Sequence, residues 1–218
     1  MPKTLIVFDM DGVLVEPRSS WSIVHQALGT KEHAQLYARL YWEGRISYMD
    51  WMLADTTLWL ESEPGLTKHR LLEILGDAAE PRGEAYDAVA LLRSRGFEVA
   101  IISGGLDLVA ERVAGKLGIR LWVSPRLLFD KEGRLLPGGV PLVEADAKHR
   151  WLLRFMRETG AARACVAGDT RLDAPMMRLA GCGVAVNPLD DVVVRAAGGR
   201  IARDPLEAAE IMLGVLSG

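Results

Sequence analysis

Short apolar segments recur along this chain, and each one ends at a glycine, serine, aspartate or asparagine. They are Leu5–Phe8 before Asp9, Val99–Ile102 before Ser103, Ala164–Ala167 before Gly168 and Asp169, and Gly183–Val186 before Asn187. Runs of this length that are bounded by turn residues are typical of parallel strands buried on both faces. The feature therefore predicts a sheet of parallel strands.

Helical patterns fill the intervals between these segments, and a glycine follows each of them. The predicted helices are Ala85–Arg95 before Gly96, Leu106–Leu117 before Gly118, Lys148–Thr159 before Gly160, and Asp173–Ala180 before Gly181. Strands that alternate with glycine-terminated helices favour a doubly wound α/β fold, with a Rossmann-like parallel-sheet core.

Two segments interrupt the alternation. Residues 18–79 contain no convincing strand, and their apolar positions recur at helical spacing, so we expect a helical cap inserted after the first strand. Residues 121–143 predict a β-hairpin insertion, with Leu121–Val123 and Arg126–Phe129 extended, a turn over 130–133 and a return strand at Leu135 and Leu136. The expected division is a core of residues 1–17 and 80–218 and a cap of residues 18–79.

Composition excludes several classes of protein. The 26 basic and 29 acidic residues give a net charge of −3, which offers no general attraction for nucleic acid. No apolar run approaches the roughly 18 residues of a membrane span, and the N-terminus does not resemble a signal peptide. Cys165 and Cys182 lie in apolar surroundings, and we interpret them as small core side chains rather than a disulfide framework. These features favour a cytoplasmic location.

Polar residues gather where the predicted strands end. Because ligands of open α/β sheets bind at the carboxyl ends of the strands, Asp9, Asp11, Ser103 and Asp169 should share one crevice. Carboxylates at close range repel one another, and an all-oxygen set suits Mg²⁺. No cluster of histidine and cysteine competes, since His25, His33 and His69 fall in the cap and His149 stands alone. The alternative is a purely structural role, in which Asp9 and Asp11 only form a turn.

The spacing of these residues suggests separate chemical roles. Asp9 is placed to act as a carboxylate nucleophile, and Asp11 to protonate a leaving alkoxide and then to activate water. Ser103 and the amide of Gly104 open a helix, which is a natural site for an anion. Lys148, at the start of another predicted helix, would supply a cation unless it is an ordinary surface lysine.

The set resembles the haloacid dehalogenase superfamily of aspartate-nucleophile phosphatases. Four motifs stand in the expected order: Asp9-Met-Asp11-Gly12-Val13-Leu14, Ser103 after a strand, Lys148, and Gly168-Asp169-Thr170-Arg171-Leu172-Asp173. The resemblance implies that Asp9 is the nucleophile and a Mg²⁺ ligand, and that Asp11 is the acid/base with its backbone carbonyl on the metal.

The remaining motifs carry the resemblance further. It implies that Ser103 and Gly104 bind the phosphoryl group, and that Lys148 steadies nucleophile and phosphate. Asp169 would be a metal ligand, and Asp173 a direct or water-mediated one, although Asp173 is equally suited to cap the helix that follows. We also expect Arg171 to contact phosphate or a substrate anion, with an exposed surface role as the alternative.

From Ser103 onward the chain is similar to the phosphoserine phosphatase branch of the superfamily. It departs from that branch at the positions that recognise substrate. The branch's early glutamate falls at Arg18, its cap arginine falls near Leu53 to Asp55 where no arginine stands, and its asparagine before the last motif aspartate is Leu172.

We therefore expect a Mg²⁺-dependent phosphatase that hydrolyses a small phosphorylated metabolite through an aspartyl-phosphate, as a monomer or homodimer with no nucleic-acid or membrane partner. Two alternatives remain open at this stage. One is a phosphotransferase or phosphomutase of the same superfamily, and the other is a phosphate-binding module without turnover.

Overall fold

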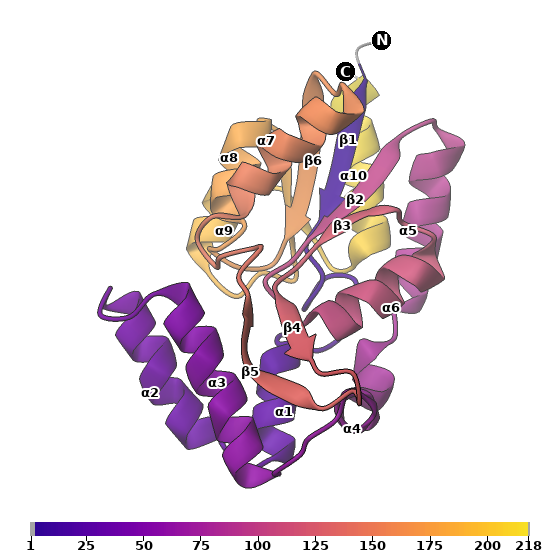
Figure 1. Cartoon of the computed structure of the whole chain (residues 1–218). Coiled ribbons are helices and arrows are strands. Elements are labelled where there is room, and N and C mark those ends of the chain that lie inside the picture. The colour runs from indigo at the N-terminus through magenta and orange to yellow at the C-terminus, as the bar shows by residue number, and fades with distance from the viewer. Residues whose placement is uncertain (1–2, 218) are drawn as a thin grey trace.

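The structure, a computed structural model, describes residues 3–217 and is built on one parallel sheet (Figure 1). The strands run in the order β3 (Leu121–Val123), β2 (Glu98–Ile102), β1 (Thr4–Phe8), β6 (Arg163–Gly168), β7 (Gly183–Val186) and β8 (Ile201–Ala202). In the centre, Ile6 of β1 pairs with Val99 of β2 on one side and with Cys165 of β6 on the other. The prediction of a doubly wound α/β fold is confirmed.

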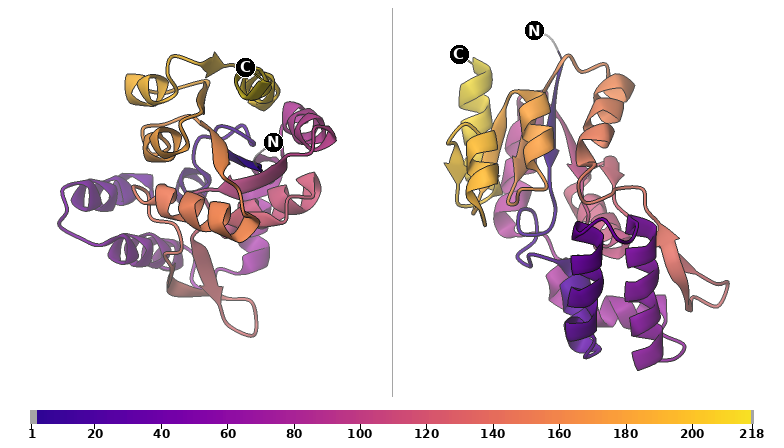
Figure 2. Two further views of the ribbon diagram at one scale, coloured as in Figure 1. Left: turned by 90° about the horizontal axis from the view of Figure 1, so that it is seen from above. Right: turned by 90° about the vertical axis from the view of Figure 1, so that its left-hand side faces the viewer.

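Helices cover both faces of the sheet (Figures 1 and 2). One face carries α5 (Gly83–Ser94), α6 (Asp107–Leu117) and α10 (Pro205–Ser217), and the other carries α7 (Lys148–Thr159), α8 (Ala174–Ala180) and α9 (Asp191–Ala196). The side chains of β1 alternate between these layers, with Ile6 and Phe8 in one buried cluster and Leu5 and Val7 in the other. Full burial on both faces explains why the strands lack polar alternation.

The cap lies beyond the carboxyl ends of the central strands (Figure 1). It contains α1 (Ser20–Ala27), α2 (Lys31–Trp42), α3 (Tyr48–Ser62), α4 (Lys68–Leu75) and a 3₁₀ helix at Gly76–Ala79. Trp59 of α3 is fully buried and packs with Leu66, Leu71 and Leu75 in the same apolar cluster. This cluster also contains Ile6 and Phe8 of β1, so this part of the cap shares one apolar core with the sheet. Within residues 3–217, no helix has both the length and the apolar character needed to cross a membrane.

The hairpin is shorter than the sequence predicts. It consists of β4 (Arg126–Phe129) and β5 (Leu135–Val140), which pair antiparallel with an irregularity between Leu127 and Leu128. The expectation that Leu121–Val123 belongs to the hairpin is wrong, because this segment forms β3 and pairs parallel with β2 in the main sheet. The hairpin packs against α3, where the Gly138 amide donates to Thr56 Oγ1 at 2.7 Å.

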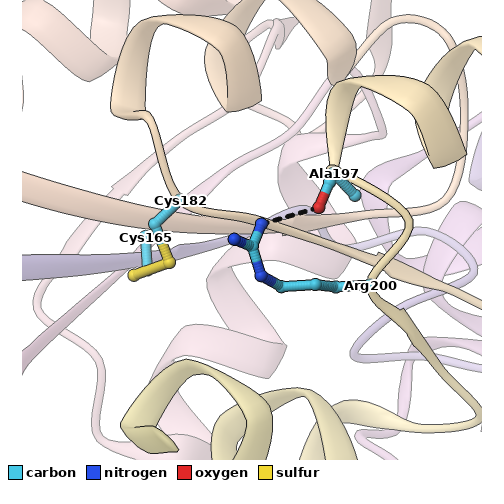
Figure 3. Close-up of a disulfide and its surroundings, with 4 residues drawn as sticks. All are labelled: Cys165, Cys182, Ala197 and Arg200. Carbon is cyan, nitrogen blue, oxygen red and sulfur yellow. Dashed lines mark hydrogen bonds between the residues drawn. A yellow bond between two sulfur atoms is a disulfide. The ribbon is translucent and has the colours of Figure 1, made fainter. Parts of the chain in front are cut away.

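The interpretation of the two cysteines needs a correction. Both are buried, as expected, but Cys165 of β6 and Cys182 beside β7 form a disulfide (Figure 3). The two strands are parallel neighbours, and the pairing of Val166 with Gly183 sets the two cysteines side by side, with Cα atoms 4.6 Å apart. The side chain of Arg200, which donates to the Ala197 carbonyl at 2.8 Å, lies nearby (Figure 3).

Candidate active site

Three aspartates from two neighbouring strand ends form a buried acidic cluster. Asp9 follows β1, Asp169 follows β6, and Asp173 immediately precedes α8. Each offers a carboxylate oxygen that lies within 4.8 Å of the others, and all three residues are buried. The topology causes this meeting, because β1 and β6 are adjacent and end at the same edge of the sheet.

Lys148 links two members of this cluster. The first residue of α7, it places Nζ 2.9 Å from Asp9 Oδ1 and 2.8 Å from Asp173 Oδ1. Burial alone would lower the pKa of this lysine, but the carboxylates of Asp173 and Asp9 outweigh that effect and raise it. Lys148 is therefore a fixed positive charge inside the site and not a surface lysine.

The acids in the cluster are poorly solvated. Burial raises the pKa of Asp9, with a further increase from Asp173 and a partial reduction from Lys148. Burial likewise raises the pKa of Asp169 to about 6, against a lowering hydrogen bond from Arg18. Arg18 Nη1 lies 2.8 Å from Asp169 Oδ2, and its side chain is 34% exposed.

These residues fit a hard divalent cation. Their donors are all carboxylate oxygens, their charges exceed what Lys148 and Arg18 compensate, and they converge within a few ångströms. The predicted ligands Asp9, Asp169 and Asp173 are thus brought together. The side chain of Asp11 is not part of this group.

Asp11 is held by a residue that sequence reasoning did not identify. The amide and hydroxyl of Ser20 donate to Asp11 Oδ2 at 2.8 and 2.9 Å, while Asp11 Oδ1 has no hydrogen-bond partner among the described residues. The neighbouring Ser19 caps α1 by accepting from the Ser22 amide. A serine at a helix start ordinarily predicts only capping, so the signal for Ser20 was ambiguous.

Two glycines allow the backbone to pass close to the Asp11 and Asp169 carboxylates. A Cβ on Gly105 would lie 2.6 Å from Asp11 Oδ2 and 2.8 Å from Ser20 Oγ, so no larger residue fits there. Gly12 has a φ of +74°, and a Cβ on it would collide with the Asp169 carboxylate.

Ser103 and Gly104 follow β2 and lie beside the acidic residues of the site. Ser103 is fully buried, and its Oγ accepts from the Gly105 amide at 2.9 Å. The Gly104 carbonyl accepts from Trp21 Nε1 of the cap at 3.1 Å, which ties the loop to α1. Both residues line the same cavity as Asp9, Asp11 and Lys148.

This cavity, which we call the cap cavity, lies between the acidic cluster and helices α1 to α3. Its volume is about 350 Å³, and its cap side includes Trp21, His25, Trp42, Tyr48, Trp51 and Asp55. Arg171 is exposed and is not among the lining residues; its guanidinium lies 5.2 Å from the centroid of the Trp42 ring. The structure thus brings together every predicted site residue except Arg171.

Comparison with known proteins agrees with this geometry. Residues 6–178 match the family model of haloacid dehalogenase-like hydrolases. The chain is 29% identical to a phosphoserine phosphatase of Albidiferax ferrireducens, over 83% of this chain and 77% of that protein. It is 27% identical to a phosphoserine phosphatase of Methanocaldococcus jannaschii, over 84% and 85% of the two chains.

Solved structures show the same fold. A phospho-aspartyl intermediate analogue of phosphoserine phosphatase superposes with a TM-score of 0.79 at 22% identity, over 97% of this chain and all of that one. A hydrolase of the same family from Salmonella enterica gives a TM-score of 0.80 at 20% identity, over 97% and 72% of the two chains. With the family model covering most of its length, this chain belongs to the haloacid dehalogenase-like hydrolases.

Proposed function

We propose that this protein is a Mg²⁺-dependent phosphatase that hydrolyses a small phosphorylated metabolite through an aspartyl-phosphate on Asp9. The observation that carries the proposal is the buried Asp9–Lys148–Asp173 arrangement at the floor of the cap cavity. Such a site holds a nucleophilic carboxylate, a fixed cation and room for a small ester. The phosphatase names of the curated relatives support the same reaction class.

The phosphoryl group would be bound by residues from three segments. The hydroxyl of Ser103 and the amide of Gly104 are hydrogen-bond donors at the start of the loop before α6, and Lys148 adds positive charge. Asp9, Asp169 and Asp173 would hold the Mg²⁺ ion, which neutralises phosphoryl charge when it is bound.

Asp9 then attacks phosphorus, and a new phosphorus–oxygen bond forms as the bond to the ester oxygen breaks. Asp11 donates its proton to that leaving oxygen. Burial raises the pKa of Asp11, which favours the protonated acid that this step needs.

In the second half, water attacks the aspartyl-phosphate while Asp11 accepts its proton. Inorganic phosphate leaves, and Asp9 returns to a carboxylate. The free Oδ1 of Asp11 is the atom available for both proton transfers, because Oδ2 accepts the two Ser20 hydrogen bonds.

Substitution of the nucleophile tests the proposal. Asp9→Asn should abolish Mg²⁺-dependent hydrolysis of p-nitrophenyl phosphate while leaving the circular dichroism spectrum unchanged. The exposed Asp87→Asn serves as a control for loss of one carboxylate elsewhere in the core. Hydrolysis that survives in a folded Asp9→Asn protein would remove Asp9 from the role of nucleophile.

A further inference from the structure

The cap side of the cap cavity is a wall of aromatic rings. Trp21 comes from α1, Trp42 from α2, and Tyr48 and Trp51 from α3. The ring of Trp51 lies 5.8 Å from that of Tyr48 and 6.3 Å from that of Trp42, so the three form one continuous group. Aromatic faces attract cations, and the Arg171 guanidinium already lies 5.2 Å from the Trp42 centroid.

One carboxylate lies in this wall. Asp55 of α3 is only 5% exposed, yet it lines the cavity. Its Oδ1 receives no hydrogen bond of good geometry from the described residues, and His25 Nε2 stands 3.3 Å away. His25 offsets only part of the cost of burying this carboxylate, and a positive group beside it would offset more.

His25 is held on one ring nitrogen and faces Asp55 with the other. The indole Nε1 of Trp59 donates to His25 Nδ1 at 3.0 Å, and an indole nitrogen can only donate. Nδ1, which also lies 2.8 Å from Thr30 Oγ1, is therefore an acceptor, and Nε2 is the ring nitrogen 3.3 Å from Asp55 Oδ1. Burial raises the pKa of Asp55, the neighbouring His25 lowers it in part, and a cationic ligand would lower it further.

The other basic side chains of the cavity are engaged or exposed. Lys148 pairs with Asp9 and Asp173, and Arg18 pairs with Asp169. Among the described lining residues that leaves Lys31, which is exposed at the start of α2. A substrate carboxylate placed against the aromatic wall would thus meet Asp55 and no buried cation.

We propose that Asp55 and the aromatic wall bind an ammonium group, and that the substrate is the phosphate monoester of an amino alcohol without a carboxylate. The inference rests on the proposed function, since the same cavity holds the phosphoryl site at its other end. The cation is attracted by the Asp55 charge and by the ring faces of Trp42, Tyr48 and Trp51, while its methyl or methylene groups contact apolar surface.

Binding to the Asp9→Asn protein tests this without turnover. Calorimetric titrations in Mg²⁺ buffer would compare 2-aminoethyl phosphate and choline phosphate with 3,3-dimethylbutyl phosphate, the uncharged isostere of choline phosphate, and with O-phosphoserine. At least one of the cationic esters should bind at least tenfold more tightly than both the isostere and O-phosphoserine. The better of the two distinguishes a primary from a quaternary ammonium.

Substitutions in the same protein locate the effect. Adding Asp55→Asn should reduce the preference over the isostere to less than threefold, whereas Glu61→Gln, the same loss of charge at an exposed position of α3, should retain it. Equal or tighter binding of the isostere or of O-phosphoserine would overturn the inference, as would a preference that survives Asp55→Asn. Failure of the proposed function is a separate result, seen as absence of phosphate release by the wild-type protein.

Discussion

Ser20 donates two hydrogen bonds to a single oxygen of Asp11. The amide and the hydroxyl lie 2.8 and 2.9 Å from Oδ2, and the hydroxyl oxygen also accepts from the Leu106 amide at 2.8 Å. Ser20 begins α1, so the cap helix itself orients the carboxyl group that we assign to acid/base chemistry. The position of the first cap helix is thereby linked to the geometry of proton transfer at Asp11.

Ser20→Ala should slow hydrolysis of alkyl phosphates by about tenfold to a hundredfold, because a hydrogen bond to a charged group is worth about 1.5–3 kcal/mol. Hydrolysis of p-nitrophenyl phosphate should fall much less, since its leaving group needs no proton. The hydroxyl of Ser20 lowers the pKa of Asp11, so its loss should shift the alkaline limb of the pH–rate profile, where the general acid loses its proton, to higher pH. A parallel loss with both substrates and an unchanged profile would reduce Ser20 to a structural role.

Lys148→Met should destabilise the metal-free protein by about 3 kcal/mol or more, because it leaves Asp9 and Asp173 buried without their cation. Urea unfolding at neutral pH measures this loss. The effect should shrink at low pH, where the carboxyl groups are protonated, and Mg²⁺ should recover part of it. Wild-type stability in the absence of metal would contradict the arrangement.

Arg18→Met should increase the affinity for Mg²⁺ several-fold in isothermal titration. The Arg18 guanidinium lies 2.8 Å from Asp169 Oδ2, so it competes for an oxygen that we assign to the metal and repels an incoming cation. Arg171→Met is the matched control. Arg171 lies on the same loop as Asp169 but packs over Trp42, so its loss should change the Mg²⁺ affinity less. Weaker Mg²⁺ binding in Arg18→Met would show that Arg18 supports the site.

Asp107 makes stability depend on pH. Burial raises its pKa to about 6 from the ordinary 3.8, so between these values the folded protein holds a proton that the unfolded chain has released. Stability should therefore fall as pH rises from about 4 to about 6, by at most about 3 kcal/mol. Asp107→Asn should flatten this interval and stabilise the protein at pH 7, as measured by urea unfolding at several pH values. An unchanged slope would exclude Asp107 as its source.

The order of strands and helices was predictable because each element carries its own signal. Apolar runs that end in Asp9 or Asp169, and helices that end at Gly118 or Gly160, are local patterns. The convergence of Asp9, Asp169 and Lys148 followed from sheet topology together with family motifs.

Contacts between distant segments were not predictable. Nothing local to Ser20 indicates that Asp11 is its partner, and nothing near Asp55 indicates that it faces the same cavity as Asp9. The assignment of Leu121–Val123 to a hairpin failed for a related reason, since a three-residue strand does not reveal its partner. These features depend on how the cap and the sheet pack, which periodicity does not encode.

The disulfide is another contact between separate segments that local sequence patterns do not reveal, and it should stabilise the fold. Cys165 and Cys182 are 17 residues apart, and a cross-link closing a loop of about that length stabilises a protein by about 3 kcal/mol through the unfolded chain. The double variant Cys165→Ala and Cys182→Ala should therefore unfold at lower urea concentration than the oxidised wild type. Because both sulfurs are buried beside β6, thiol reductants should act slowly on the folded protein and fast in urea. Equal unfolding midpoints for the oxidised wild type and the double variant would show that the cross-link adds no stability.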